Sequence, residues 1–175
     1  ATTEQQRREE VREVGPDGVD RIVIATGGSG KFPRDPRLRR CGFGAYYAPG
    51  HPGNTAKPLL GPCQVVPRAE LPAVLQVATT EPRPCVILCD CDFVVEGAQA
   101  MICGLATEHL DHQDLWIELQ AALRARPDGS FQIRKIPAHT KEWEIGVTIS
   151  ARDRAMNDAV DSLAKDGADD EGHRV

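Results

Sequence analysis

The feature that most restricts the fold is a short apolar run that ends in glycines, RIVIATGGSG at residues 21–30. Its Val, Ile and Ala residues favour a buried β-strand, because β-branched side chains suit a pleated surface that is covered by other elements. The glycines that follow accept positive φ angles and let other atoms approach the backbone closely. The run therefore predicts a strand that leads into either a glycine turn or a ligand-binding loop.

Two phosphate-binding motifs fail to match this run. A G-x-x-x-x-G-K-[ST] loop would need glycine at Ala25 and a hydroxyl group at Phe32. A G-x-G-x-x-G fingerprint that starts at Gly28 would need glycine at Pro33. A glycine turn that closes a hairpin stays open as the plain interpretation.

The length and composition are those of one globular domain. A chain of 175 residues can bury a proper core, and 41% hydrophobic with 27% charged residues is ordinary. Because no apolar stretch approaches the ~20 residues of a membrane-spanning helix, we expect no membrane partner. The net charge of −5 argues against a broadly basic nucleic-acid binder. It leaves room for a protein that neutralises phosphate locally or through metal ions.

The six cysteines indicate reduced thiols rather than a disulfide framework or a zinc site. They stand at positions 41, 63, 85, 89, 91 and 103, and no two of them form a C-x-x-C pair. We expect core thiols, which favour an intracellular over a secreted protein. Because the chain begins with Ala1 and a polar stretch, we interpret it as a piece of a longer chain, such as a polyprotein, without a signal peptide.

The pattern of apolar residues predicts three strands, a helix, a strand, two helices, a strand and a final helix. This order favours an α/β fold with a mixed five-stranded sheet, in which three antiparallel strands precede the parallel ones and helices cover both faces. The predicted strands are 21–30, 41–48, 59–66, 85–89 and 131–136, and the predicted helices are 68–78, 93–101, 114–123 and about 154–164, with a long loop over 137–153.

The two ends of the chain are predicted to lie outside this domain. Residues 1–18 are polar and charged, and we interpret them as an N-terminal extension that is either disordered or a solvated helix ending near Gly15. Residues 169–175 form an acidic tail. The domain itself is then residues 19–168.

Three acids fall at places where they can act together. Glu70 is on the first long helix, Asp90 follows a buried strand, and Asp161 is on the last helix. Acids far apart in sequence can converge at one sheet edge around Mg²⁺, which takes oxygen ligands. Two such ions, roughly 3.5–4 Å apart, stabilise the attacking and leaving oxygens in phosphodiester hydrolysis. Each acid also has a structural interpretation: a charge in a first helical turn, a helix N-cap and a surface residue.

Four blocks of sequence, in the right order, resemble a type 1 ribonuclease H domain of the kind found in retroelements. The resemblance extends from about Arg21 to Ala168 and implies the three-layer ribonuclease H fold. The blocks are residues 68–71; residues 86–90 with 93–97; His112 with residues 114–116 and Leu119; and residues 137–139 with 157–164.

The resemblance implies a monomeric domain that cleaves the RNA strand of RNA–DNA hybrids by metal-dependent endonucleolytic hydrolysis. Carried over by position, Glu70, Asp90 and Asp161 would hold two Mg²⁺ ions, with Mn²⁺ as an alternative. His139 would aid proton transfer or product release, although an exposed loop histidine is the plainer interpretation. The matching candidates for substrate binding are Ser29, Gln64 and Arg68.

The chain departs from the family pattern at the end of the first strand. The family has Thr-Asp-Gly-Ser there, and that aspartate bridges both metal ions, whereas residues 26–29 are Thr-Gly-Gly-Ser. Gly27 therefore stands where a carboxylate belongs, with Asp35 and Asp92 as the available substitutes. We expect impaired hydrolysis. The alternatives are a catalytically inactive domain with a nucleic-acid-binding or structural role, and a related carboxylate–metal nuclease with another nucleic-acid substrate.

The sequence shows no dedicated basic protrusion that would hold a nucleic-acid duplex. The candidate for a local phosphate-facing patch is instead a group of cations between the first two predicted strands. They are Lys31, Arg34, Arg37, Arg39 and Arg40.

Overall fold

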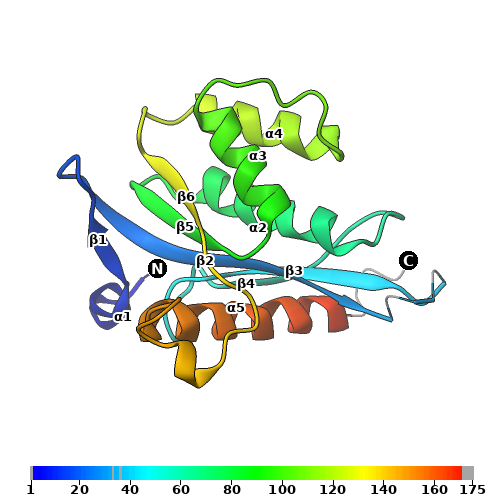
Figure 1. Cartoon of the computed structure of the whole chain (residues 1–175), viewed down its shortest axis with the longest axis horizontal. Coiled ribbons are helices and arrows are strands. Elements are labelled where there is room, and N and C mark those ends of the chain that lie inside the picture. The colour runs from blue at the N-terminus through cyan, green and yellow to red at the C-terminus, as the bar shows by residue number, and fades with distance from the viewer. Residues whose placement is uncertain (1, 33, 36, 171–175) are drawn as a thin grey trace.

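A computed structural model describes residues 2–32, 34–35 and 37–170. It shows one mixed sheet with helices on both faces (Figure 1), so the predicted three-layer α/β fold is confirmed. The strands are β1 (Arg12–Val14), β2 (Asp20–Lys31), β3 (Arg40–Tyr46), β4 (Thr55–Pro58), β5 (Cys85–Cys89) and β6 (Phe131–Lys135). The helices are α1 (Glu4–Glu9), α2 (Val66–Thr80), α3 (Asp92–Ile102), α4 (Gln113–Arg124), the 3₁₀-helix η1 (Glu142–Glu144) and α5 (Ala151–Asp169).

The sheet has the strand order β4-β3-β2-β5-β6, and β1 pairs with β2 off this path. β2, β3 and β4 form the predicted antiparallel meander, whereas β5 runs parallel to β2 and β6 runs parallel to β5. β5 runs parallel to β2 and ends at Cys89, one residue after Leu88, which pairs with Ala25. The carboxyl end of β5 therefore lies beside the middle of β2, and β2 continues past it to Lys31.

β2 lies between the two helical layers, and its side chains alternate between them. Ile22 and Ile24 belong to the apolar cluster under α2, α3 and α4, while Val23 and Ala25 pack with Val160 of α5. Figure 1 shows α5 along the face of the sheet opposite to α2, α3 and α4. The same alternation directs Gly27, further along the strand, toward α5.

The predicted third strand, residues 59–66, is wrong. The strand is β4, which ends at Pro58, and α2 already begins at Val66. The segment between them is a loop. The Gln64 side chain keeps this loop in place, because its amide nitrogen donates hydrogen bonds to the Leu59 and Gly61 carbonyl oxygens at 2.9 and 2.7 Å. Leu59 is a single buried residue in this loop and not part of a strand with alternating buried and exposed residues.

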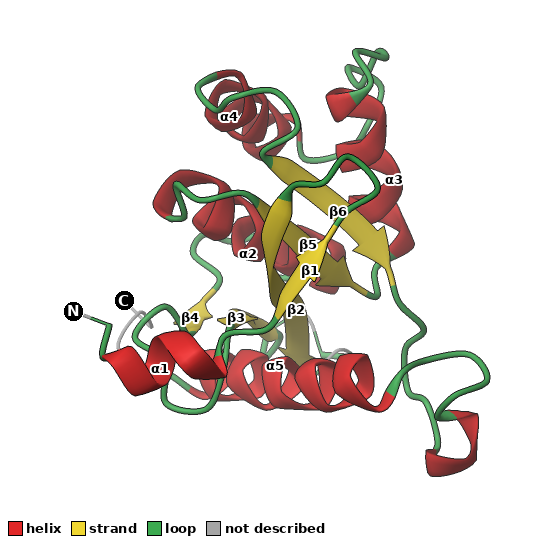
Figure 2. Cartoon of the chain, turned by 90° about the vertical axis from the view of Figure 1, so that its left-hand side faces the viewer, coloured by secondary structure: helices red, strands yellow, loops and turns green. Residues whose placement is uncertain are grey.

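The N-terminal segment is more ordered than the sequence predicts. Instead of disorder or a helix reaching Gly15, it forms the short helix α1 and then β1, whose Arg12 pairs with Ile22 of β2. Figure 2 shows β1 beside β2. A sixth strand is thereby added to the five predicted. The division of the chain into residues 1–18, 19–168 and 169–175 stays a prediction, and residues 171–175 lie outside the described part.

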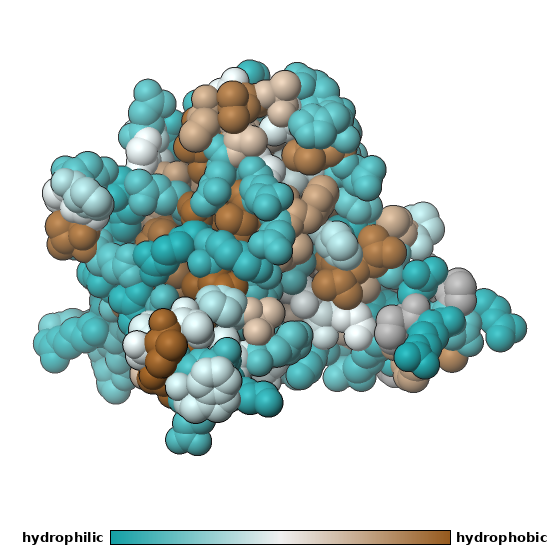
Figure 3. Space-filling view, in the orientation of Figure 1, coloured by the Kyte–Doolittle hydropathy of each residue, from teal (hydrophilic) through white to brown (hydrophobic). Residues whose placement is uncertain are grey.

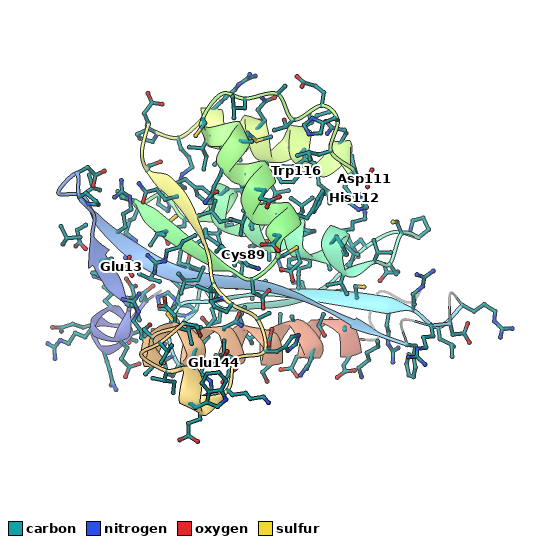
Figure 4. The ribbon with its side chains drawn as sticks, in the orientation of Figure 1. Glu13, Cys89, Asp111, His112, Trp116 and Glu144 are labelled. Atoms are coloured by element: carbon teal, nitrogen blue, oxygen red, sulfur yellow. The ribbon has the colours of Figure 1, made fainter. Side chains whose placement is uncertain are left out.

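Ion pairs fasten β1 to the rest of the domain. Glu13 (labelled in Figure 4) accepts hydrogen bonds from Arg134 of β6 at 2.9 and 3.0 Å and is paired with Arg152 of α5. The hydrogen bonds from Arg134 hold the pKa of Glu13 down at about 2. One residue cluster therefore joins β1, β6 and the first turn of α5.

The other helices agree closely with their predicted ranges, and α5 is longer than predicted at both ends. α5 begins after Ser150, whose hydroxyl caps the helix by accepting a hydrogen bond from the Asp153 backbone N–H at 3.0 Å. All six cysteines are free thiols. No helix in the described ranges is long and apolar enough to cross a membrane.

Candidate active site

Glu70, Asp90 and Asp161 come from three different parts of the chain and lie near the carboxyl end of β5 and the middle of β2. Glu70 is in the second turn of α2, Asp90 directly follows β5, and Asp161 is in the middle of α5. Cys89, the last residue of β5, marks this edge in Figure 4. The charge of Asp90 raises the pKa of both Glu70 and Asp161, so the three carboxylates lie within electrostatic reach of one another.

Glu70 is the most deeply buried of the three, with 4% of its surface exposed. Burial first, and then the charges of Asp90 and Asp161, raise its pKa to about 8, against the opposing effect of a hydrogen bond from the Gly28 backbone N–H. Its Oε2 is buried and has no hydrogen-bond partner within the described residues. A buried carboxylate oxygen without a partner is costly unless a cation or a proton satisfies it.

Asp90 and Asp161 are partly buried, and neighbouring side chains set their environment. Burial, followed by the charge of Asp90, raises the pKa of Asp161, while Lys165 and His139 act in the opposite direction. Asp90 Oδ2 accepts a hydrogen bond from Asn157 Nδ2 at 3.3 Å. That bond fixes one oxygen of Asp90 and leaves the other free to bind a ligand.

Asn157 and Lys135 are site residues that the sequence did not single out. Lys135 ends β6, donates to the carbonyl oxygen of Asp90 and pairs with the Asp92 carboxylate at 3.2 Å. Asn157 precedes Asp161 by four residues on α5, and this helical spacing could have identified it because such residues share one face. Lys135 could be found only once β6 was known to lie parallel to β5.

Gly27 occupies a position from which a side chain would point toward the acids. It is buried in β2, and a Cβ atom added to it would lie 3.3 Å from Val160 Cγ1 and 3.9 Å from Asp161 Oδ1. On the other face, a Cβ atom at Gly28 would lie 3.0 Å from the backbone nitrogen of Glu70. Gly27 therefore lies beside Asp161.

The two possible substitute acids have other partners. Asp92 is the first residue of α3, has a side chain that is 74% exposed, and pairs with Lys135. Asp35 accepts a hydrogen bond from the Arg37 backbone N–H at 3.0 Å within its own turn. Neither contact directs the carboxylate toward Gly27.

His139 lies on the loop that follows β6, is exposed and has a φ angle of 51°. It acts on Asp161 electrostatically, so it lies on the same side of the site as α5. The loop continues into η1, which projects from the domain in Figure 2. A role for His139 in proton transfer or product release stays a prediction.

The three candidates for substrate binding are differently placed. Ser29 is partly exposed on β2, two residues beyond Gly27. Gln64 also accepts the Cys41 backbone N–H at 2.7 Å, so its amide is occupied by the protein itself. Arg68 forms a two-pronged ion pair with Asp114 of α4 at 2.9 and 2.6 Å. Their contact with a substrate stays a prediction.

The donor atoms of the site suit a hard divalent cation, because all three acids offer carboxylate oxygens and Glu70 has one without a partner. The set is nevertheless incomplete. Throughout residues 2–32, 34–35 and 37–170, no three His, Cys, Asp or Glu side chains form a group that could hold a metal ion as placed.

A mixed sheet with three acids grouped near the carboxyl end of β5 defines an α/β protein with a candidate carboxylate site. The model of the RNase H family matches residues 20–169, and the chain belongs to that family. Comparison with curated proteins found no match.

Solved structures show the same fold. The solution structure of the PFV RNase H domain matches with a TM-score of 0.61 and 21% identity over 83% of this chain and 93% of that one. A foamy viral protease-reverse transcriptase, solved in complex with dsDNA, matches with a TM-score of 0.53 and 20% identity over 83% and 92%. RNase H1 from the archaeon Halobacterium salinarum matches with a TM-score of 0.54 and 16% identity over 85% and 98%.

Replacing Glu70 with glutamine is expected to raise the melting temperature at pH 9 by several degrees and to change it little at pH 5. A carboxyl group whose pKa is raised to about 8 by folding favours the folded state below its unfolded pKa. That contribution is lost as the pH rises through about 8, whereas glutamine stays neutral. Calorimetry in the presence of a chelator measures the difference, and an equal shift at both pH values would contradict the assignment.

Proposed function

We propose that this chain binds RNA–DNA hybrids and hydrolyses their RNA strand with the help of divalent cations, at a rate much reduced by Gly27. Membership of the RNase H family supports the reaction class. The observation that carries the proposal is the convergence of Glu70, Asp90 and Asp161 beside a glycine from which a side chain would point at Asp161.

In this proposal the protein supplies the ligands and their orientation. Glu70, Asp90 and Asp161 would hold Mg²⁺ or Mn²⁺, which when bound stabilises negative charge on the attacking and leaving oxygens. The hydrogen bond from Asn157 orients Asp90, and Lys135 holds the backbone that carries it. The exposed His139 side chain, which acts on Asp161 electrostatically, would aid proton transfer or product release.

Gly27 accounts for the reduced rate. Loss of one anionic ligand removes electrostatic stabilisation of several kcal/mol, roughly, and each 1.4 kcal/mol or so corresponds to tenfold in rate. The same observation favours a second candidate function, a hybrid-binding domain that no longer turns over. The two candidates differ only in whether metal-dependent cleavage is measurable.

The test is a cleavage assay on one labelled sequence, prepared as RNA–DNA hybrid, RNA duplex and DNA duplex, with Mg²⁺ and with Mn²⁺. We expect slow, metal-dependent cleavage of the RNA strand of the hybrid alone, and we expect Asp90→Asn to abolish it. Hybrid binding without cleavage would favour the non-catalytic candidate. Cleavage that survives Asp90→Asn, or equal binding of hybrid and DNA duplex, would contradict the proposal.

A further inference from the structure

We propose that the hairpin between β2 and β3 is a contact for the phosphate backbone of the bound duplex. We call residues 31–40 the cationic hairpin, after Lys31, Arg34, Arg37, Arg39 and Arg40. The inference rests on the proposed function, because it names how the hybrid is held beyond the carboxylates.

The charge of this hairpin is opposite to that of the protein as a whole. It has five cationic residues and one acid, Asp35, in a chain with a net charge of −5. A local excess of positive charge on an acidic protein indicates a specific anionic partner, since general attraction to polyanions would need a basic surface overall.

Most of these cations have no close ion-pair partner among the described residues. Arg37 has a side chain that is 90% exposed and only a 3.5 Å contact with Asp35, and neither Arg34 nor Arg39 has an ion pair within the described residues. The two remaining cations are structural, because Lys31 pairs with Asp169 of α5 and Arg40 lies over the Phe32 ring. The exposed guanidinium groups of Arg34 and Arg37, together with that of the half-buried Arg39, are therefore available to an external partner.

The hairpin is connected directly to the candidate active site, because its first strand, β2, also carries Gly27. Lys31 follows Gly27 by four residues in β2, so the hairpin begins about 13 Å along the strand from Gly27, at roughly 3.3 Å per residue. It extends past the sheet at the right of Figure 1, and the same end is largely hydrophilic in Figure 3. A duplex presents a negative charge about every 1.7 Å along its axis, so one that fills the site has several phosphates within this distance.

The residue type favours phosphate over other anions as the ligand. Four of the five cations are arginines, whose planar guanidinium group matches two phosphate oxygens at once. Phosphate contacts position a duplex without reading its sequence, which is what a nuclease of broad sequence range needs.

The test replaces the three free arginines together, as Arg34→Gln, Arg37→Gln and Arg39→Gln. A matched control removes three arginines elsewhere, as Arg7→Gln, Arg8→Gln and Arg124→Gln, and changes the net charge equally. Binding of a labelled hybrid is measured by fluorescence anisotropy with a chelator present, from about 50 to about 200 mM salt. We expect the hairpin variant to bind about tenfold or more weakly at low salt and to lose up to ~2.7 from the slope of log K against log salt.

The outcomes separate this inference from the proposed function. If the unaltered chain binds the hybrid and the hairpin variant binds with the same affinity and salt slope, the hairpin contact is overturned while the proposed function stands. Equal weakening by the control variant would also overturn it, because net charge alone would explain the effect. If the unaltered chain fails to bind the hybrid, both are overturned.

Discussion

Replacing Gly27 with aspartate is expected to raise the rate of metal-dependent cleavage of an RNA–DNA hybrid at least about a hundredfold. The substitution places a carboxylate on the strand position that faces Asp161, where a Cβ atom would lie 3.9 Å from Asp161 Oδ1. A fourth acid beside Glu70, Asp90 and Asp161 would complete the ligand set. Single-turnover cleavage with Mg²⁺ and with Mn²⁺ measures the gain, and titration calorimetry measures the accompanying increase in metal affinity.

Gly27→Asn is the matched control, because the asparagine side chain has nearly the same size and shape as that of aspartate but no charge. Space is the other variable, since the new Cβ would lie only 3.3 Å from Val160 Cγ1. We therefore include Val160→Ala with Gly27→Asp, which removes that methyl contact. If neither aspartate variant gains activity or metal affinity over the asparagine control, although both fold and bind hybrid, the proposal that Gly27 reduces the rate of cleavage is contradicted.

The parts of the fold that sequence predicts well are those with long or strongly apolar patterns. The helix around Trp116 and the buried strand 85–89 are found almost at their true bounds, because their apolar residues bury against several neighbours at once. β1 is missed and β4 is predicted at the wrong residues, since each has only three or four residues at the side of the sheet. These strands form because they pair with β2 and β3, whereas their own residues show no clear strand pattern.

The residues of the candidate site also differ in how well the sequence predicts them. Glu70, Asp90 and Asp161 are indicated by their places on predicted elements, whereas Lys135 and Asn157 act through tertiary contacts with Asp90. The sequence also does not show that the Gln64 amide is hydrogen-bonded to the backbone of Cys41 and Leu59, because a polar side chain has many potential partners. Hydrogen bonds between distant residues depend on packing, and packing is known only from the structure.

Replacing Gly42 with alanine is expected to destabilise the protein by about 3 kcal/mol or more, and so to lower the melting temperature by ~6–12 °C. Gly42 lies in β3 directly under α5, and a Cβ atom there would overlap the backbone of Gly167 and Ala168. Backbone atoms of a packed helix cannot rotate away as the end of a flexible side chain can. α5 would have to lift from the sheet along the face where Ala164 and Ala168 are fully buried.

Gly27→Ala is the matched comparison for this prediction, since both glycines face α5 from neighbouring strands. At Gly27 the added Cβ meets a methyl group of Val160 at 3.3 Å rather than backbone, so we expect a loss of less than about 1 kcal/mol. Because α5 also carries Asp161 and Asn157, Gly42→Ala should weaken metal binding in the Gly27→Asp background even where the protein stays folded. Similar melting temperatures for the two alanine variants would show that α5 does not rest on the backbone of β3 as closely as the structure indicates.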